Sequence, residues 1–253
     1  MYEKHELFDA PFDQDVLWRY MDFTKFVSML DSRALYFTRA DKYEDLFEGR
    51  YPKKSMQIYE RECRRVHAAA NMPAELSEVV IKGMASVFDG MRGTVGINCW
   101  HKNKHESAAM WKLYLKSCEG VAVKTTFSKF SKSFINAGCP VLIGNVKYID
   151  FDDAQVDFGN SLSPFLLKRV TFEHEKEVRA IIWKHGLLQG GSELERNGFS
   201  HGTSVGCDMS ILIEEVYVAP TSPDWFKALV VSVVRNYGLE VDVRQSRLDE
   251  FPY

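Results

Sequence analysis

The sequence predicts an α+β fold, a single domain with a mixed, twisted β-sheet flanked by helices. Eight segments are rich in β-branched or aromatic residues and are bounded by turn formers, as strands are. Helical segments fall between them irregularly, with few clean strand–helix–strand repeats. The chain has 253 residues, of which 45% are hydrophobic and 26% are charged, which is an ordinary globular composition. We therefore expect one domain over residues 1–253.

The strand segments run along the whole chain. A typical one is ALYFTRA, in which aromatic and β-branched residues lie close together. The expected strands are residues 16–23, 34–40, 93–101, 120–127, 141–150, 177–183, 213–220 and 239–246.

Five helices are expected between these strands. The first, 24–32, starts at Thr24, which can cap it, and carries apolar residues at helical spacing. Two charged helices at 53–70 and 74–92 are separated by Pro73, which would break a continuous helix. We interpret them as a helical insertion at about 52–92. The other two are 106–117, and 222–238, which has a Ser-Pro start and a Gly stop. The segments 186–210 and 151–163 are expected to be loops.

Charge and cysteine content narrow the function classes. The net charge of −3 gives no overall attraction to nucleic acid or to an acidic membrane. The net charge does not exclude a local basic patch. Five cysteines without a C-x-x-C pair indicate reduced thiols rather than a metal site or disulfides. The N-terminus lacks a signal-peptide core, and no apolar run is long enough to cross a membrane. We expect a soluble, cytoplasmic protein with no membrane partner.

Three segments carry candidate binding residues. In WRYMD, the guanidinium of Arg19 is flanked by Trp18 and Tyr20, and could contact a phosphate or pair with a surface acid. The segment 37–50 interleaves aromatic residues with acids and is either a ligand-facing loop that includes Glu48 or a short solvated helix. In 99–120, Asn103 and Glu106 match a capping box, and Ser107 is a second candidate cap. Trp100, His101, Lys104 and His105 give that helix start a basic, aromatic lead-in of the kind that attracts anions.

The run EHEKEVRA places Glu173, Glu175 and Glu177 at every second position. On a strand these carboxylates would share a face and repel one another unless cations answered them. Spacing alone leaves two explanations open, an ion-pair network or a carboxylate held to meet a substrate. The cations available for such a network are Lys168, Arg169 and Arg179.

These stretches together resemble a bacterial family catalogued as domain of unknown function 2971. The segments that carry the resemblance are LWRYMDF, ALYFTRADKYEDLFEGR, NCWHKNKHESAAMWKLYL, EGVAVKTTF and FLLKRVTFEHEKEVRAII, between residues 16 and 183. The family name supplies no activity.

A looser resemblance is to ADP-ribosyltransferases, which have a split sheet and carry an Arg or His on the first strand, a middle Tyr or Ser, and a late Glu-x-Glu. In this chain Arg19-Tyr20, then Tyr114 or Ser107, then Glu175-Lys176-Glu177 would fill these motifs. The resemblance implies NAD as the substrate. It also implies a setting such as a toxin or a phage-defence effector, with a protein or nucleic acid as acceptor.

The same resemblance implies a role for each residue. Arg19 would grip the pyrophosphate, and Tyr114 or Trp111 would stack on the nicotinamide ring. Glu177 would contact the ribose and stabilise the oxocarbenium ion, while Glu175 would orient or deprotonate the acceptor.

Two other hypotheses compete with this enzyme. One is a non-catalytic module that binds a nucleotide or a protein, in which the glutamates only form salt bridges. The other, ranked lowest, is a metal-dependent nuclease that uses Asp45, Glu48 and Glu175; the chain lacks the basic surplus such an enzyme would show. For the preferred hypothesis, the NAD-dependent enzyme, we expect no metal site.

Overall fold

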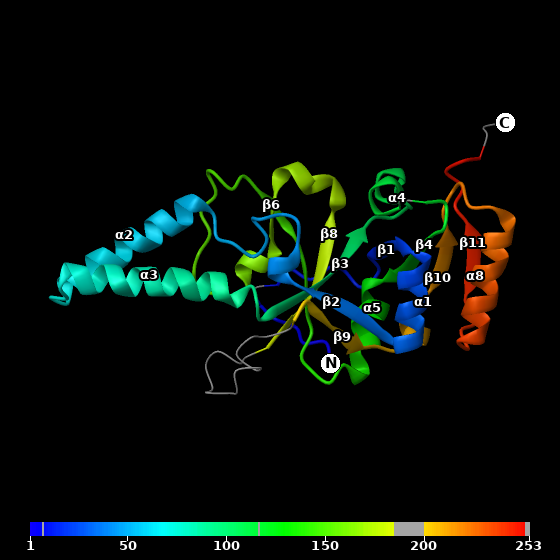
Figure 1. The fold of residues 1–253 in the computed structure, drawn as a ribbon, viewed down its shortest axis with the longest axis horizontal. Helices are drawn as coiled ribbons and strands as arrows, with labels where there is room; N and C mark the ends of the chain where they lie inside the picture. Colours follow the sequence, from blue (N-terminus) through cyan, green and yellow to red (C-terminus); the bar gives the residue numbers. More distant parts are fainter. Residues whose placement is uncertain (7, 116, 185–199, 251–253) are drawn as a thin grey trace.

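A nine-stranded mixed sheet lies at the centre of the computed structural model, which describes residues 1–6, 8–115, 117–184 and 200–250. These residues form an α+β domain, as predicted (Figure 1). Neighbouring strands are antiparallel except for the last two in the chain. The strand order is β11 (Asp242–Gln245), β10 (Glu215–Val218), β4 (Gly120–Thr126), β1 (Val16–Asp22), β3 (Val95–Lys102), β2 (Ala34–Arg39) and β9 (Gly202–Gly206), with β8 (Glu177–Trp183) also on β3 and β5 (Leu142–Asn145) beyond β8.

The sheet is split along one edge of β3. β1 pairs with β3 at residues 101–102, whereas β2 pairs with it at residues 96–97. Residues 98–100 therefore have no strand partner on this edge, while β8 pairs with β3 continuously on the other edge. The opening between β1 and β2 places side chains of both strands around one hollow.

Helices cover the sheet on both faces. One face packs against α1 (Phe23–Ser32), α5 (Phe127–Ser133), α7 (Met209–Leu212) and α8 (Asp224–Asn236), and α4 (Ala108–Tyr114) packs against the other. In α1, Phe26, Met29 and Leu30 are buried at helical spacing. Asp22 caps this helix by accepting a hydrogen bond from the backbone N–H of Lys25 at 2.8 Å, so the predicted cap, Thr24, is wrong.

Two long helices form a hairpin that extends away from the sheet, at the left of Figure 1. They are α2 (Lys53–Ala69) and α3 (Ala74–Met91), and Pro73 precedes α3, as the sequence predicts. Aromatic rings pack at the base of the hairpin, with Tyr51 and Phe158 stacked at 4.2 Å between ring centroids. No helix in the described ranges has the length and apolar character needed to cross a membrane.

Short elements account for most of the differences from the sequence expectations. The segment 141–150 forms two strands, because the chain leaves the main sheet after β5 and continues as β6 (Lys147–Ile149) beside β7 (Leu167–Arg169). β9 lies within the expected loop 186–210; its flanking glycines weaken strand propensity, and pairing with β2 supplies the structure. Residues 186–199 of that expected loop lie outside the described residues.

Several elements of only one or two turns carry too little periodicity to be predicted from the sequence. Besides α5 and α7, they are the 3₁₀ helices η1 (Ala40–Lys42), η2 (Phe134–Asn136), η3 (Ser163–Leu166) and η4 (Val170–Glu175).

Candidate functional site

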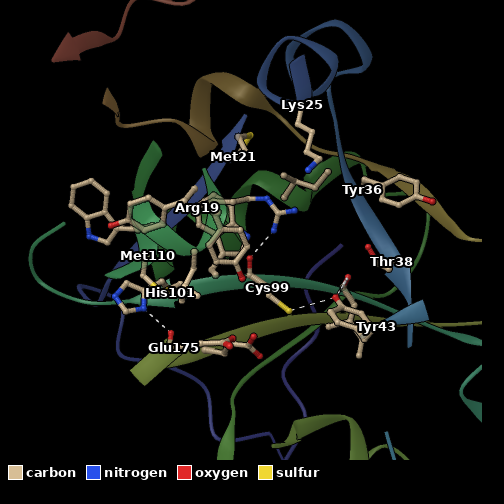
Figure 2. A pocket seen from close by; sticks show the side chains of 18 of the residues that line it. Arg19, Met21, Lys25, Tyr36, Thr38, Tyr43, Cys99, His101, Met110 and Glu175 are labelled. Atoms are coloured by element: carbon tan, nitrogen blue, oxygen red, sulfur yellow. Dashed lines mark hydrogen bonds between the residues drawn. The ribbon is translucent and has the colours of Figure 1, made fainter. Parts of the chain in front are cut away.

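A cavity of about 820 Å³ lies where the sheet splits (Figure 2). Its walls come from β1, β2, β3, α1, α4, β7, β8, β9, η4 and the segment 43–48. Glu175 lies at one end and Lys25 and Tyr36 lie toward the other, with Arg19 between them (Figure 2). This volume is within the range of small-molecule sites, which are about 300–1,000 Å³.

A network of five ionisable side chains lies at the Glu175 end, with Arg179 as its hub. Arg179 is fully buried and donates from Nη2 to Oε2 of Glu48 at 2.9 Å, with a second, short contact from Nη1 to the same carboxylate. Its Nε donates to Oε2 of Glu177 at 2.7 Å, and Nη1 also donates to the carbonyl oxygen of Phe165 at 2.8 Å. The members of the network are Glu48, Lys168, Glu175, Glu177 and Arg179.

Lys168 joins the two cavity glutamates. Its Nζ lies 2.8 Å from Oε1 of Glu177 and 2.6 Å from Oε2 of Glu175. The ammonium also lies 4.9 Å from the centre of the Phe172 ring. The network therefore contains three carboxylates and two cations. Both oxygens of Glu177 contact a cation, whereas Lys168 contacts only one oxygen of Glu175.

The expected strand over 173–177 is wrong. Residues up to Glu175 form η4, Lys176 has a left-handed backbone with φ of +40°, and β8 begins only at Glu177. This turn brings Glu175 and Glu177 onto one lysine and leaves Glu173 exposed, outside the network. Nδ1–H of His101 donates to the backbone carbonyl of Glu175 at 2.6 Å and so ties the turn to β3.

The pKa values of Glu175 and Glu177 are shifted in opposite directions. Burial raises the pKa of Glu175 to about 7, and the neighbouring Glu177 carboxylate adds to the shift. Burial acts in the same direction on Glu177, but the charges of Arg179 and Lys168 outweigh it and hold the pKa of Glu177 at about 2. Near neutral pH, one carboxylate is ionised and its neighbour exchanges a proton, an arrangement typical of paired acid–base groups.

The ion-pair explanation of the glutamates is confirmed for Lys168 and Arg179. The third expected cation, Arg169, instead pairs with Asp45 at 3.0 Å. A strand over 173–177 would place His174 on the face opposite the glutamates, whereas in the structure it is exposed.

Arg19 lies on β1 at the split. Its Nη1 donates to the backbone carbonyl of Cys99 at 2.6 Å, in the part of β3 that has no strand partner on this edge. Within the described ranges no carboxylate forms an ion pair with Arg19. A half-buried guanidinium with one fixed donor and no counter-charge is suited to an anionic ligand.

Tyr20 and Tyr114 also border the cavity. The hydroxyl of Tyr20 accepts a hydrogen bond from the backbone N–H of Ser107 at 2.8 Å, which fixes its ring, and the ring of Tyr114 is about half exposed. Ser107 and Trp111 do not border the cavity. Trp111 is buried against Tyr20, with ring centroids 4.9 Å apart.

Ser107 is the cap of α4, because its hydroxyl accepts a hydrogen bond from the backbone N–H of Met110. The expected capping box from Asn103 to Glu106 is wrong: Asn103 donates to the carbonyl of His105, and Glu106 accepts from the indole of Trp111.

The structure therefore brings most of the expected site residues to one cavity. Those bordering it are Arg19, Tyr20, Glu48, Tyr114, Glu175 and Glu177. Glu48 is oriented toward Arg179 and is 2% exposed.

Sequence reasoning missed Lys25, and it gave Tyr43 no role beyond being one of the aromatic residues of the segment 37–50. The hydroxyl of Tyr43 donates to the carbonyl of Ile97 at 3.1 Å and lies 3.5 Å from the sulfur of Cys99. Both residues border the cavity, but no motif singles out either one.

The residues considered for a metal site do not form one. In the described part of the chain, no three His, Cys, Asp or Glu side chains are grouped so that they could hold an ion. The five cysteines are free thiols, and Cys118 is exposed.

No family model and no curated protein matches this chain. The resemblance to domain of unknown function 2971 therefore stays a prediction. Among solved structures, DarT of Thermus sp. 2.9 in complex with NAD⁺ is similar at a TM-score of 0.38 and 8% sequence identity, over 96% of this chain and 100% of that chain. At this TM-score, residue roles cannot be transferred from one protein to the other.

Proposed function

We propose that this chain cleaves the bond between nicotinamide and ribose in NAD, and passes the ADP-ribosyl group to an acceptor or to water. The observation that carries the proposal is the pair Glu175 and Glu177 at the end of the cavity, one carboxylate ionised and the other titrating near neutral pH. Glycosidic cleavage through an oxocarbenium ion requires a nearby negative charge and a group that moves a proton.

Different residues around the cavity would bind NAD and assist the cleavage step. Arg19 would contact the pyrophosphate, and the half-exposed ring of Tyr114 would stack on the positively charged nicotinamide ring. As the C–N bond breaks, its electron pair goes to the ring nitrogen, and the positive charge moves to the ribose. The negative charge of the Glu177 carboxylate stabilises that cation.

Glu175 acts in the second step, in which the acceptor attacks the ribose. A hydroxyl or a water molecule forms the new bond to the ribose carbon, and its proton goes to the carboxylate of Glu175. Lys168 contacts one oxygen of Glu175, and the Glu177 carboxylate lies beside it. A base with a pKa near the working pH is the most effective one for such a transfer.

The alternative is a nucleotide-binding module without turnover. It is favoured by the contacts of Glu177, both of whose oxygens already bind a cation and need no ligand.

Nicotinamide release tests the proposal. The purified protein is incubated with NAD, with and without cell lysate, beside Glu177→Gln and the matched control Glu173→Gln, which changes an exposed glutamate outside the network. We expect release from the wild type and from the control, and none from Glu177→Gln. NAD binding, measured by calorimetry, should persist in all three proteins.

Glu177→Gln is expected to fold. Without the Glu177 charge, the pKa of Glu175 falls, so the two remaining carboxylates balance Arg179 and Lys168. NAD binding without release, with or without lysate, would favour the binding module. Failure to bind NAD at all would reject both the enzyme and a module that binds NAD.

A further inference from the structure

The end of the cavity farthest from Glu175 is cationic and rich in hydroxyl groups. One face of α1 borders it with Lys25, Ser28 and Ser32, which are three to seven residues apart and therefore share a helix face. The opposite wall includes Tyr36 on β2 and Ser204 on β9. Of the cavity residues that α1, β2 and β9 contribute, Lys25 alone is charged.

Lys25 is held loosely enough to bind a ligand. Its Nζ lies 3.0 Å from Oδ2 of Asp22, and its side chain is 76% exposed. An exposed pair of this kind contributes little to stability, so a phosphate can compete for the ammonium. Asp22 keeps its other partners without Lys25 Nζ, because the hydroxyl of Thr24 and the backbone N–H of Lys25 both donate to it.

The two ends of the cavity carry opposite chemistry. Arg19 and Lys25 offer positive charge along one part, and the surplus carboxylate of the Glu175 network lies at the other (Figure 2). A ligand that fills the whole cavity must therefore be anionic in one part, and cationic or hydroxylated in the other.

We propose that Lys25 and Arg19 bind successive phosphates of one ligand, so that the site selects a nucleoside diphosphate unit over the bare nucleoside. This inference rests on the proposed function for the identity of the whole substrate, but phosphate selection is measurable without turnover. A nucleoside alone leaves both cations without a partner, whereas a diphosphate supplies a charge for each.

The test uses ADP and adenosine as probes, with binding measured by calorimetry on the full chain. The variant is Lys25→Gln, and its matched control is Lys129→Gln, which changes an exposed, ion-paired lysine on α5 that does not border the cavity. The wild type and Lys129→Gln should bind ADP at least tenfold more tightly than adenosine. Lys25→Gln should weaken ADP binding by about fivefold, the effect of one charge pair near water, and leave adenosine unchanged. Raising the salt concentration should reduce the preference for ADP.

Each other outcome has a distinct meaning. Equal affinity for ADP and adenosine, or ADP binding that Lys25→Gln leaves unchanged, would overturn the role of Lys25. Preference for ADP that depends on Lys25, without cleavage of NAD, would leave this inference standing and reject the proposed function. NAD cleavage with a KM that Lys25→Gln does not raise would reject this inference alone. A wild type that binds neither probe would overturn it as well.

Discussion

Replacing Arg179 by Met tests whether the buried network supports the fold. Arg179 and Glu48 have side-chain exposures of 0% and 1%, and form a two-point contact. Arg179→Met keeps much of the side-chain length but removes the charge, and leaves Glu48 and Glu177 without their shared partner. The network would then hold three carboxylates and a single cation, Lys168, which contacts Glu175 and Glu177.

The expected loss of stability is large. Removing one partner of a buried ion pair destabilises a protein by about 3–5 kcal/mol. For a chain of this length, each kcal/mol lowers Tm by about 2–4 °C, so the variant should melt roughly 10 °C below the wild type at pH 7. Thermal unfolding followed by circular dichroism measures the difference.

A surface pair supplies the control. Arg64 makes a similar two-point contact with Glu78, but its side chain is 47% exposed. Arg64→Met should therefore change Tm little, because exposed ion pairs contribute little. Adding Glu48→Leu to Arg179→Met should recover part of the loss by removing the stranded carboxylate. If Arg179→Met melts no lower than Arg64→Met, the network does not stabilise the fold.

Two further predictions concern the same region. Between pH 4.5 and about 7, folded Glu175 holds a proton that the unfolded chain has released, so wild-type stability should fall as the pH rises through this window. Glu175→Gln should remove that slope in urea denaturation at pH 5 and pH 8, and an unchanged slope would show that another group causes it. Gly49→Ala should destabilise by about 1–3 kcal/mol, since φ is +70° and the new Cβ would lie 2.5 Å from the Phe165 ring. Gly90 lies in helix α3, and a Cβ there would meet no neighbouring side chain within 4 Å, so Gly90→Ala should match or exceed wild-type stability. Equal melting of the two variants would contradict the strain at Gly49.

Local patterns predict the longer elements well. Strand segments and the α2–α3 pair follow from residue type and from Pro73, because each pattern is contained in a few adjacent residues. The split of the sheet was implied by the family resemblance and is confirmed by the pairing of β3.

The network depends on information that no local pattern carries. Glu48 and Arg179 lie 131 positions apart, and neither residue identifies the other as its partner. The turn that joins Glu175 to Glu177 uses a left-handed lysine, Lys176, where a glycine would have revealed the change of direction. Contacts with β3 hold that backbone in place: His101 donates to the carbonyl of Glu175, and the backbone N–H of Lys102 donates to the carbonyl of Lys176 at 2.9 Å.

Counting charges in the network shows which of its members are needed for a neutral cluster and which one is not. Glu48 and Glu177 already balance Arg179 and Lys168, so four residues would complete a neutral buried cluster. Glu175 adds a third carboxylate that borders the cavity, is only partly exposed and has a raised pKa. A group in this setting lowers stability at neutral pH, since its charged form is disfavoured in the folded state. Stability alone does not explain its presence, whereas a ligand that exchanges a proton or presents a positive charge at this end of the cavity does.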